Sequence, residues 1–61
     1  MKKLKNRQIG EQFTIETNSI NKLTTYGVGT LIKHEDGEYI VELKNGDRLT
    51  CDGYEATNDI R

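Results

Sequence analysis

The fold is decided by residues 26–54, YGVGTLIKHEDGEYIVELKNGDRLTCDGY, which predict three short strands joined by two tight turns. Asp36-Gly37 and Asn45-Gly46 each separate two runs in which apolar and polar residues alternate. These dipeptides tolerate the positive φ angles that tight hairpin turns require. Two such turns about ten residues apart are typical of an all-β sandwich or barrel. The stretch therefore predicts an antiparallel meander to which the other segments attach.

Alternation within the meander predicts which side chains face the core, because successive residues of a strand point to opposite faces. Ile40 falls on the outward parity, between Glu38 and Glu42. It is therefore predicted to be an outward apolar side chain that another segment covers or that a second chain contacts. The side chains predicted to face the core are Tyr39, Val41, Leu43, Leu49 and Cys51.

Upstream of the meander, Ile9, Phe13 and Ile15 share one parity, which predicts a half-buried strand. Phe13 is the only phenylalanine and is expected at the centre of the core. Gly27 and Gly29 alternate just before the second strand, where glycine marks a bulge, a bend or a close backbone approach.

Two segments are less regular. Residues 17–25, TNSINKLTT, are rich in Thr, Asn and Ser, which predicts a long loop. Within it, Ile20 and Leu23 are expected either to fold back as a plug or to form an exposed apolar pair for a partner. Residues 54–57 predict one turn of 3-10 helix, followed by a closing edge strand over residues 58–60 with Ile60 in the core.

The order of these elements resembles a known architecture. A long first loop, two tight hairpins and a 3-10 turn before a last strand are the layout of the five-stranded SH3-like small barrel. The run GVGTLIKHEDGEYIVELKNGD resembles the barrel shared by Tudor, chromo-barrel and KOW-type domains. The resemblance covers roughly residues 9–60 and implies a non-catalytic module that recognises protein segments or nucleic acid. With no tryptophan and 7% aromatic residues, the chain lacks the composition of a proline-rich peptide groove.

Size and composition set further limits. A chain of 61 residues predicts one domain close to the smallest size that a single apolar core can support. One cysteine excludes an internal disulfide, and no apolar run has the length of a signal peptide core or a membrane span. A cytoplasmic protein with no membrane contact is expected.

The net charge of −1 conceals an asymmetry along the chain. Residues 1–8 show no periodicity and predict a flexible basic arm in front of an acidic domain, residues 9–61. Such an arm would be either a solvated tail or a contact to phosphates. Its cations are Lys2, Lys3, Lys5 and Arg7.

No catalytic or metal-binding arrangement is predicted. His34 and Cys51 are the only histidine and the only cysteine, and they are expected at a hairpin tip and in the core respectively. Carboxylates close in sequence belong to turns, and no spacing matches a metal site. No enzyme activity and no cofactor are therefore expected.

Binding residues are predicted where the resembled barrels place their ligand face, at the end of the first loop and in the 3-10 turn. Tyr26 and Tyr54 fall at these two places and would hold a lysine or arginine by cation–π contact, helped by nearby acids. They could equally cap the barrel with hydroxyls in water. The predicted partner-binding residues are Tyr26, Tyr54, Asp52, Glu55, Ile20 and Leu23.

Three functions stay open at this point. The acidic domain favours a regulatory or adaptor module for a basic protein partner. Its small size and its proline-free composition rich in Lys, Asn and Ile suggest a phage or mobile-element protein that modulates a host factor. The basic arm favours nucleic-acid binding, with tyrosine stacking. An exposed edge strand or Ile40 favours a homo-oligomer.

Overall fold

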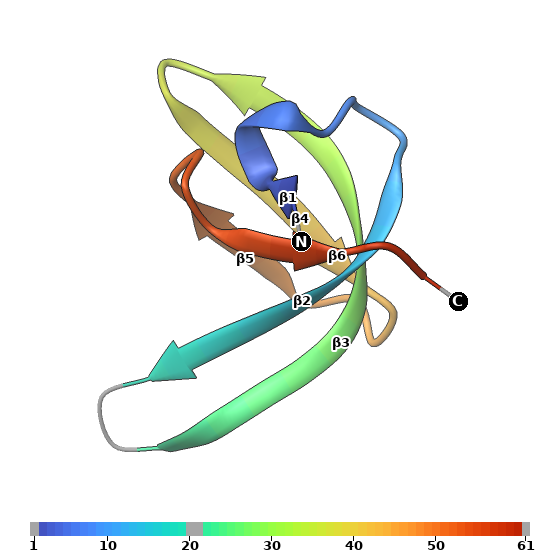
Figure 1. The fold of residues 1–61 in the computed structure, drawn as a ribbon, viewed down its shortest axis with the longest axis vertical. Helices are drawn as coiled ribbons and strands as arrows, with labels where there is room; N and C mark the ends of the chain where they lie inside the picture. Colours follow the sequence, from blue (N-terminus) through green and yellow to red (C-terminus); the bar gives the residue numbers. More distant parts are fainter. Residues whose placement is uncertain (1, 20–21, 61) are drawn as a thin grey trace.

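The computed structural model describes residues 2–19 and 22–60, and the side chains of residues 16–26 lie outside that description. The elements are β1 (Lys2–Lys3), a 3-10 helix (Leu4–Asn6), β2 (Gln12–Ser19), β3 (Lys22–Glu35), β4 (Glu38–Leu43), β5 (Arg48–Cys51) and β6 (Ala56–Asn58). Figure 1 shows the long β2–β3 hairpin reaching to one end of the molecule, with β1, β4, β5 and β6 gathered at the other end.

The six strands form one antiparallel sheet in the order β1-β6-β2-β3-β4-β5. The predicted all-β class is therefore confirmed, but the count of five strands is wrong because the N-terminal residues add β1. Within the described residues no strand pairing joins β1 to β5, so the sheet is not closed.

Both predicted turns are present. Asp36 and Gly37 have φ angles of 52° and 79°, which is the left-handed backbone of a two-residue hairpin turn. At the second turn only Gly46 has a positive φ, 93°, and its N–H donates to the Leu43 carbonyl over 2.9 Å. Asn45 stabilises that turn through its Oδ1, which accepts from the Asp47 N–H over 2.9 Å.

The predicted loop is wrong for residues 17–19 and 22–25, and Ile20 and Asn21 lie outside the described residues. Strand β2 continues to Ser19, β3 begins at Lys22, and Ser19 pairs with Lys22. The segment is rich in threonine, whose branched Cβ suits a pleated strand, and backbone pairing outweighs the loop preference of its Asn and Ser residues. Figure 1 shows this end of the β2–β3 hairpin extending away from the other strands.

The core lies on one face of the sheet. Phe13 is completely buried, as predicted, and Leu43, Leu49 and Cys51 pack against the core from partly buried positions. The buried apolar side chains are Leu4, Phe13, Ile15, Leu31, Tyr39 and Val41.

Two core predictions are wrong. Ile9 is 64% exposed, because it lies in the turn before β2 rather than in the strand. Ile60 is 45% exposed, because the last strand is Ala56–Asn58 and its inward residue is Thr57. The 3-10 turn predicted over residues 54–57 is also absent, and the 3-10 helix of the described chain is Leu4–Asn6.

Of the two alternating glycines of β3, Gly29 permits close packing. A Cβ at Gly29 would overlap with Cγ1 of Val41 on β4, whereas a Cβ at Gly27 would lie 3.8 Å from Leu43 Cδ2, an ordinary contact. The predicted close approach is confirmed at Gly29. The bulge of β3 lies further along, between Leu31 and Lys33.

The N-terminal segment, residues 2–8, packs on the domain instead of extending from it as an arm. Lys2 and Lys3 pair with Thr57 and Ala56 of β6. Leu4 is fully buried and its N–H donates to the Glu55 carbonyl over 2.8 Å. The prediction failed because a single leucine among cations shows no periodicity, although its burial is sufficient to anchor the segment.

Candidate functional site

Arg7 lies at the centre of a network that joins the N-terminal segment to β6. Its Nε donates to Thr57 Oγ1 over 2.8 Å, and its Nη1 donates to Glu11 Oε2 over 2.7 Å and to Asp59 Oδ1 over 2.6 Å. The guanidinium carbon lies 5.2 Å from the centre of the Phe13 ring. With its side chain 1% exposed, Arg7 is a structural cation and cannot contact phosphates, contrary to the prediction.

The network shifts the titration of its two carboxylates. The hydrogen bond from Arg7 holds the pKa of Asp59 below its usual range. The pKa of Glu11 is lowered first by a hydrogen bond from the Gln8 backbone N–H and then by Arg7. Both carboxylates are therefore stabilised in the charged form that the buried guanidinium requires.

Two other cations of the N-terminal segment, Lys3 and Lys5, lie beside Tyr54. Tyr54 is in the turn between β5 and β6. The Lys3 and Lys5 Nζ atoms lie 5.2 and 4.8 Å from the centre of the Tyr54 ring, which is 67% exposed. We call Lys3, Lys5 and Tyr54 the basic-aromatic patch. The structure thus brings together residues that the sequence assigned to two different functions.

The turn that carries Tyr54 is held from both sides. Asp52 Oδ1 accepts from the Tyr54 N–H over 2.8 Å, and the Lys5 N–H donates to the Gly53 carbonyl over 2.9 Å. A Cβ at Gly53 would lie 2.9 Å from Lys5 Cβ and 3.1 Å from Tyr39 Cε1, so the backbone approaches both side chains closely. Tyr54 is therefore presented on a fixed turn.

The remaining predicted partner-binding residues are spread over the fold. Tyr26 pairs through its backbone with Glu16 in the β2–β3 hairpin, and Leu23 lies in the same part of β3. The side chains of both residues, and the whole of Ile20, lie outside the described residues. Whether Tyr26 and Tyr54 share a face stays a prediction.

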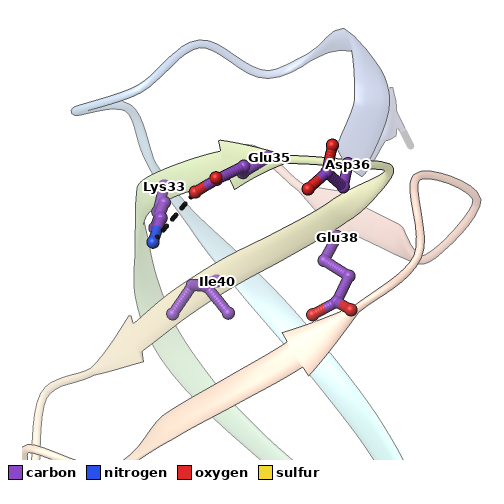
Figure 2. Close-up of a pocket in the computed structure, with 5 residues that line it drawn as sticks. All are labelled: Lys33, Glu35, Asp36, Glu38 and Ile40. Carbon is purple, nitrogen blue, oxygen red and sulfur yellow. Dashed lines mark ion pairs between the residues drawn. The ribbon is translucent and has the colours of Figure 1, made fainter.

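A hollow of about 150 Å³ opens on the β3–β4 hairpin. Figure 2 shows its lining side chains, with Ile40 lying between Lys33 and Glu38 and with Glu35 and Asp36 along the upper strand and turn. The lining residues, which we call the acidic hollow, are Lys33, Glu35, Asp36, Glu38 and Ile40.

Strand register explains how the acidic hollow forms. Lys33 pairs with Ile40 and Glu35 pairs with Glu38, so these four side chains share the face opposite to the buried Tyr39. The outward position predicted for Ile40 is confirmed, since it pairs with Lys33 and Thr50 on the face opposite to Tyr39. The alternation of residues 33–40 indicates that these side chains share the outer face, but it was not used to predict a binding site there.

Charge is unbalanced in the acidic hollow. Lys33 Nζ lies 3.1 Å from Glu35 Oε2, and both side chains are more than half exposed. Among the described residues, Asp36 and Glu38 have no ion-pair partner. Like charges directly opposite each other in a sheet, as at Glu35 and Glu38, are destabilising.

His34 and Cys51 lie on either side of Tyr39. His34 stacks on the Tyr39 ring with centroids 3.9 Å apart, and Tyr39 pairs with Cys51 on β5. The histidine and cysteine are thus two strand spacings, about 10 Å, apart. Burial raises the pKa of the Cys51 thiol, helped by Glu55 and Asp52. A protonated thiol separated from the histidine by a tyrosine ring is a poor nucleophile.

Among the described residues, 2–19 and 22–60, the His, Cys, Asp and Glu side chains form no group of three that could hold a metal ion. The same ranges contain no helix long and apolar enough to cross a membrane. Comparisons of the chain with models of protein families, with curated proteins and with solved structures find no match. The function is therefore argued from the geometry.

Proposed function

We propose that the protein is a non-catalytic recognition module that binds a basic segment of a protein partner through the acidic hollow. The observation that carries the proposal is the grouping of Glu35, Asp36 and Glu38 around Ile40 on the outer face of the β3–β4 hairpin. Its lining carries three negative charges and the one positive charge of Lys33.

The chemistry of the acidic hollow suits a lysine or arginine side chain. Such a side chain buries its aliphatic stem on apolar surface and keeps its charged head near water or acids. Ile40 offers the apolar surface, and Asp36 and Glu38 offer carboxylates. A bound cation would also relieve the repulsion between Glu35 and Glu38, so binding gains free energy that the unbound hairpin lacks.

We propose further that the sheet belongs to the SH3-like small-barrel class. The two tight hairpins, the strongly paired β2–β3–β4–β5 meander and the return of β6 to β2 support this relationship. A module of this kind would act as an adaptor or regulator in the cytoplasm. A host factor bound by a phage or mobile-element protein is the partner class that composition favours.

An NMR titration tests the proposed function. We expect a short arginine-containing peptide to shift the amide signals of residues 33–40 selectively, whereas the same peptide with glutamine in place of arginine does not. Glu38→Gln should weaken binding about threefold or more, because it removes one of the two unpaired carboxylates. Asp47→Asn, which alters the other hairpin turn, is the matched control.

Two results would contradict the proposal. One is the absence of saturable shifts in residues 33–40 at millimolar peptide. The other is an equal loss of affinity in Glu38→Gln and Asp47→Asn, since that would reflect net charge alone. Sedimentation tests a second copy as the occupant of the acidic hollow. A mass that rises with concentration and falls in Ile40→Lys would assign this surface to self-association.

A further inference from the structure

We propose that the basic-aromatic patch of Lys3, Lys5 and Tyr54 binds single-stranded nucleic acid, with Tyr54 stacking on a base and the two lysines contacting phosphates. This function is independent of the acidic hollow. The hollow lies on the outer face of β4, with Glu38 and Ile40, whereas the patch is joined through Gly53 to Tyr39 on the core face.

The patch exposes an aromatic ring on a rigid backbone support. Tyr54 is 67% exposed, the highest value among the exposed large apolar side chains of the described chain. Its backbone is fixed by Asp52 and its turn by Lys5. A fixed, exposed ring loses little conformational entropy when a base stacks on it, and such stacking tolerates any base.

Two cations lie beside the same ring. Lys3 and Lys5 alternate around the buried Leu4, and their backbones are held by β6 pairing and by the Gly53 carbonyl. Neither lysine forms an ion pair with any described residue. Two unpaired cations beside one exposed ring match the combination of charge and stacking that single-stranded nucleic acid uses.

A nucleotide fits this patch better than an acidic peptide does. A carboxylate would gain from the lysines but has no use for the ring, whereas a nucleotide offers both a phosphate and a π-face. Of the two acids near Tyr54 in sequence, Asp52 accepts the Tyr54 N–H, and neither Asp52 nor Glu55 forms an ion pair with any described residue. Arg7, which the sequence grouped with the lysines, is buried and takes no part.

The test is fluorescence anisotropy of the full chain with a labelled oligothymidine of about 12 nucleotides, between about 50 and 200 mM salt. Binding is expected to weaken as salt rises. Lys3→Gln combined with Lys5→Gln should lower the slope of log K against log salt by about 1.4, since each phosphate contact on a single strand contributes about 0.7.

Substitutions at Tyr54 distinguish base stacking from charge attraction alone. Tyr54→Ala should weaken binding about tenfold without changing the salt slope, and Tyr54→Phe should retain the wild-type affinity. Lys44→Gln, at the exposed second hairpin turn, is the matched charge control and should have little effect. Because all these side chains are on the surface, circular dichroism should show every variant folded.

Four outcomes would overturn the inference. Three of them are no binding at about 50 mM salt, equal losses in Lys44→Gln and the double lysine variant, and wild-type affinity in Tyr54→Ala. Competition by an acidic peptide that depends on the lysines but not on Tyr54 would also overturn it, and would assign the patch to acidic protein segments. Glu38→Gln should leave oligothymidine binding intact, so this result and that of the proposed function stay distinguishable.

Discussion

The N-terminal segment and the β3–β4 hairpin both carry many charges, but they use them differently. In the N-terminal segment Arg7 is buried, and two carboxylates and a hydroxyl accept its hydrogen bonds. In the hairpin, the acids surround an apolar side chain and only one lysine lies among them. Carboxylates of the chain neutralise Arg7, whereas the acids of the hairpin keep their charge available.

This difference shows that charge density alone does not mark a binding surface. The cations of residues 2–7 look equivalent in the sequence, yet burial makes Arg7 part of the architecture while Lys3 and Lys5 stay exposed. A charged side chain is structural when another secondary-structure element holds a group of opposite charge beside it, and it is available for binding when none does. For Arg7 that element is β6 and the residues that follow it.

The largest expected effect on stability comes from a substitution at Gly29, at the base of the β3–β4 hairpin. Gly29→Ala places a Cβ against Val41 Cγ1, in a position that also contacts Ile15 and Leu43. We expect a loss of about 3 kcal/mol in the free energy of unfolding, at the upper end for overpacking, measured by urea titration. Gly27→Ala, where space is available, should cost less than about 1 kcal/mol. Equal effects would show that Gly29 is not a close-packed position.

The next largest effect on stability comes from removing the hydrogen-bond network of Arg7. Arg7→Met should destabilise the protein by about 2 kcal/mol, because Thr57 loses its donor while the exposed carboxylates regain water. Hydrogen exchange should increase at the Leu4 and Lys5 amides, which pair with the β5–β6 turn. Lys3→Met is the control and should change stability by less than about 0.5 kcal/mol. Unchanged exchange in Arg7→Met would contradict the anchoring role.

A change of pH tests how much the contacts of Arg7 with Glu11 and Asp59 contribute to the free energy of unfolding. The pKa values of Glu11 and Asp59 are lowered in the folded state, so the unfolded chain binds more protons as pH falls. The stability from these contacts is full above the unfolded pKa values of about 4 and decreases as pH falls through the lowered folded values. Urea midpoints between neutral and acidic pH should therefore decrease more in the wild type than in Arg7→Met. Parallel curves would exclude this linkage.

The smallest expected effect on stability concerns the acidic hollow. Glu38→Gln should change the free energy of unfolding by less than about 0.5 kcal/mol, with a slight gain because it removes the repulsion from Glu35. The measurement is again urea titration, with Asp47→Asn as the control. A substantial loss of stability would mean that Glu38 serves the fold and would remove it from the proposed binding surface.

The sequence predicted the local part of the fold. The turns at Asp36-Gly37 and Asn45-Gly46 and the inward parity of Tyr39 and Val41 follow from backbone and alternation rules that act within a few residues. The burial of Phe13 follows from the same alternation. These features do not depend on distant contacts, so local rules are sufficient to predict them from the sequence.

The parts that the sequence missed depend on distant contacts. Arg7 is buried because Thr57 and Asp59, some fifty residues away, surround it. Likewise Leu4 becomes a core residue only because β6 and its preceding turn pair with the N-terminal segment. For the binding surfaces, the outward Ile40 was predicted, but the contact of Lys3 and Lys5 with Tyr54 required the same distant pairing.

The pairing of β1 with β6 has a consequence for the kinetics of folding. Strands β2 to β4 each pair with the next strand along the chain, whereas Lys2 pairs with Thr57. Closing so long a loop costs more chain entropy than forming a hairpin, so the meander is expected to form before the N-terminal segment docks. Contacts made after the transition state affect mainly the unfolding rate. Arg7 would thus determine how long the folded molecule persists, and hardly how fast it forms.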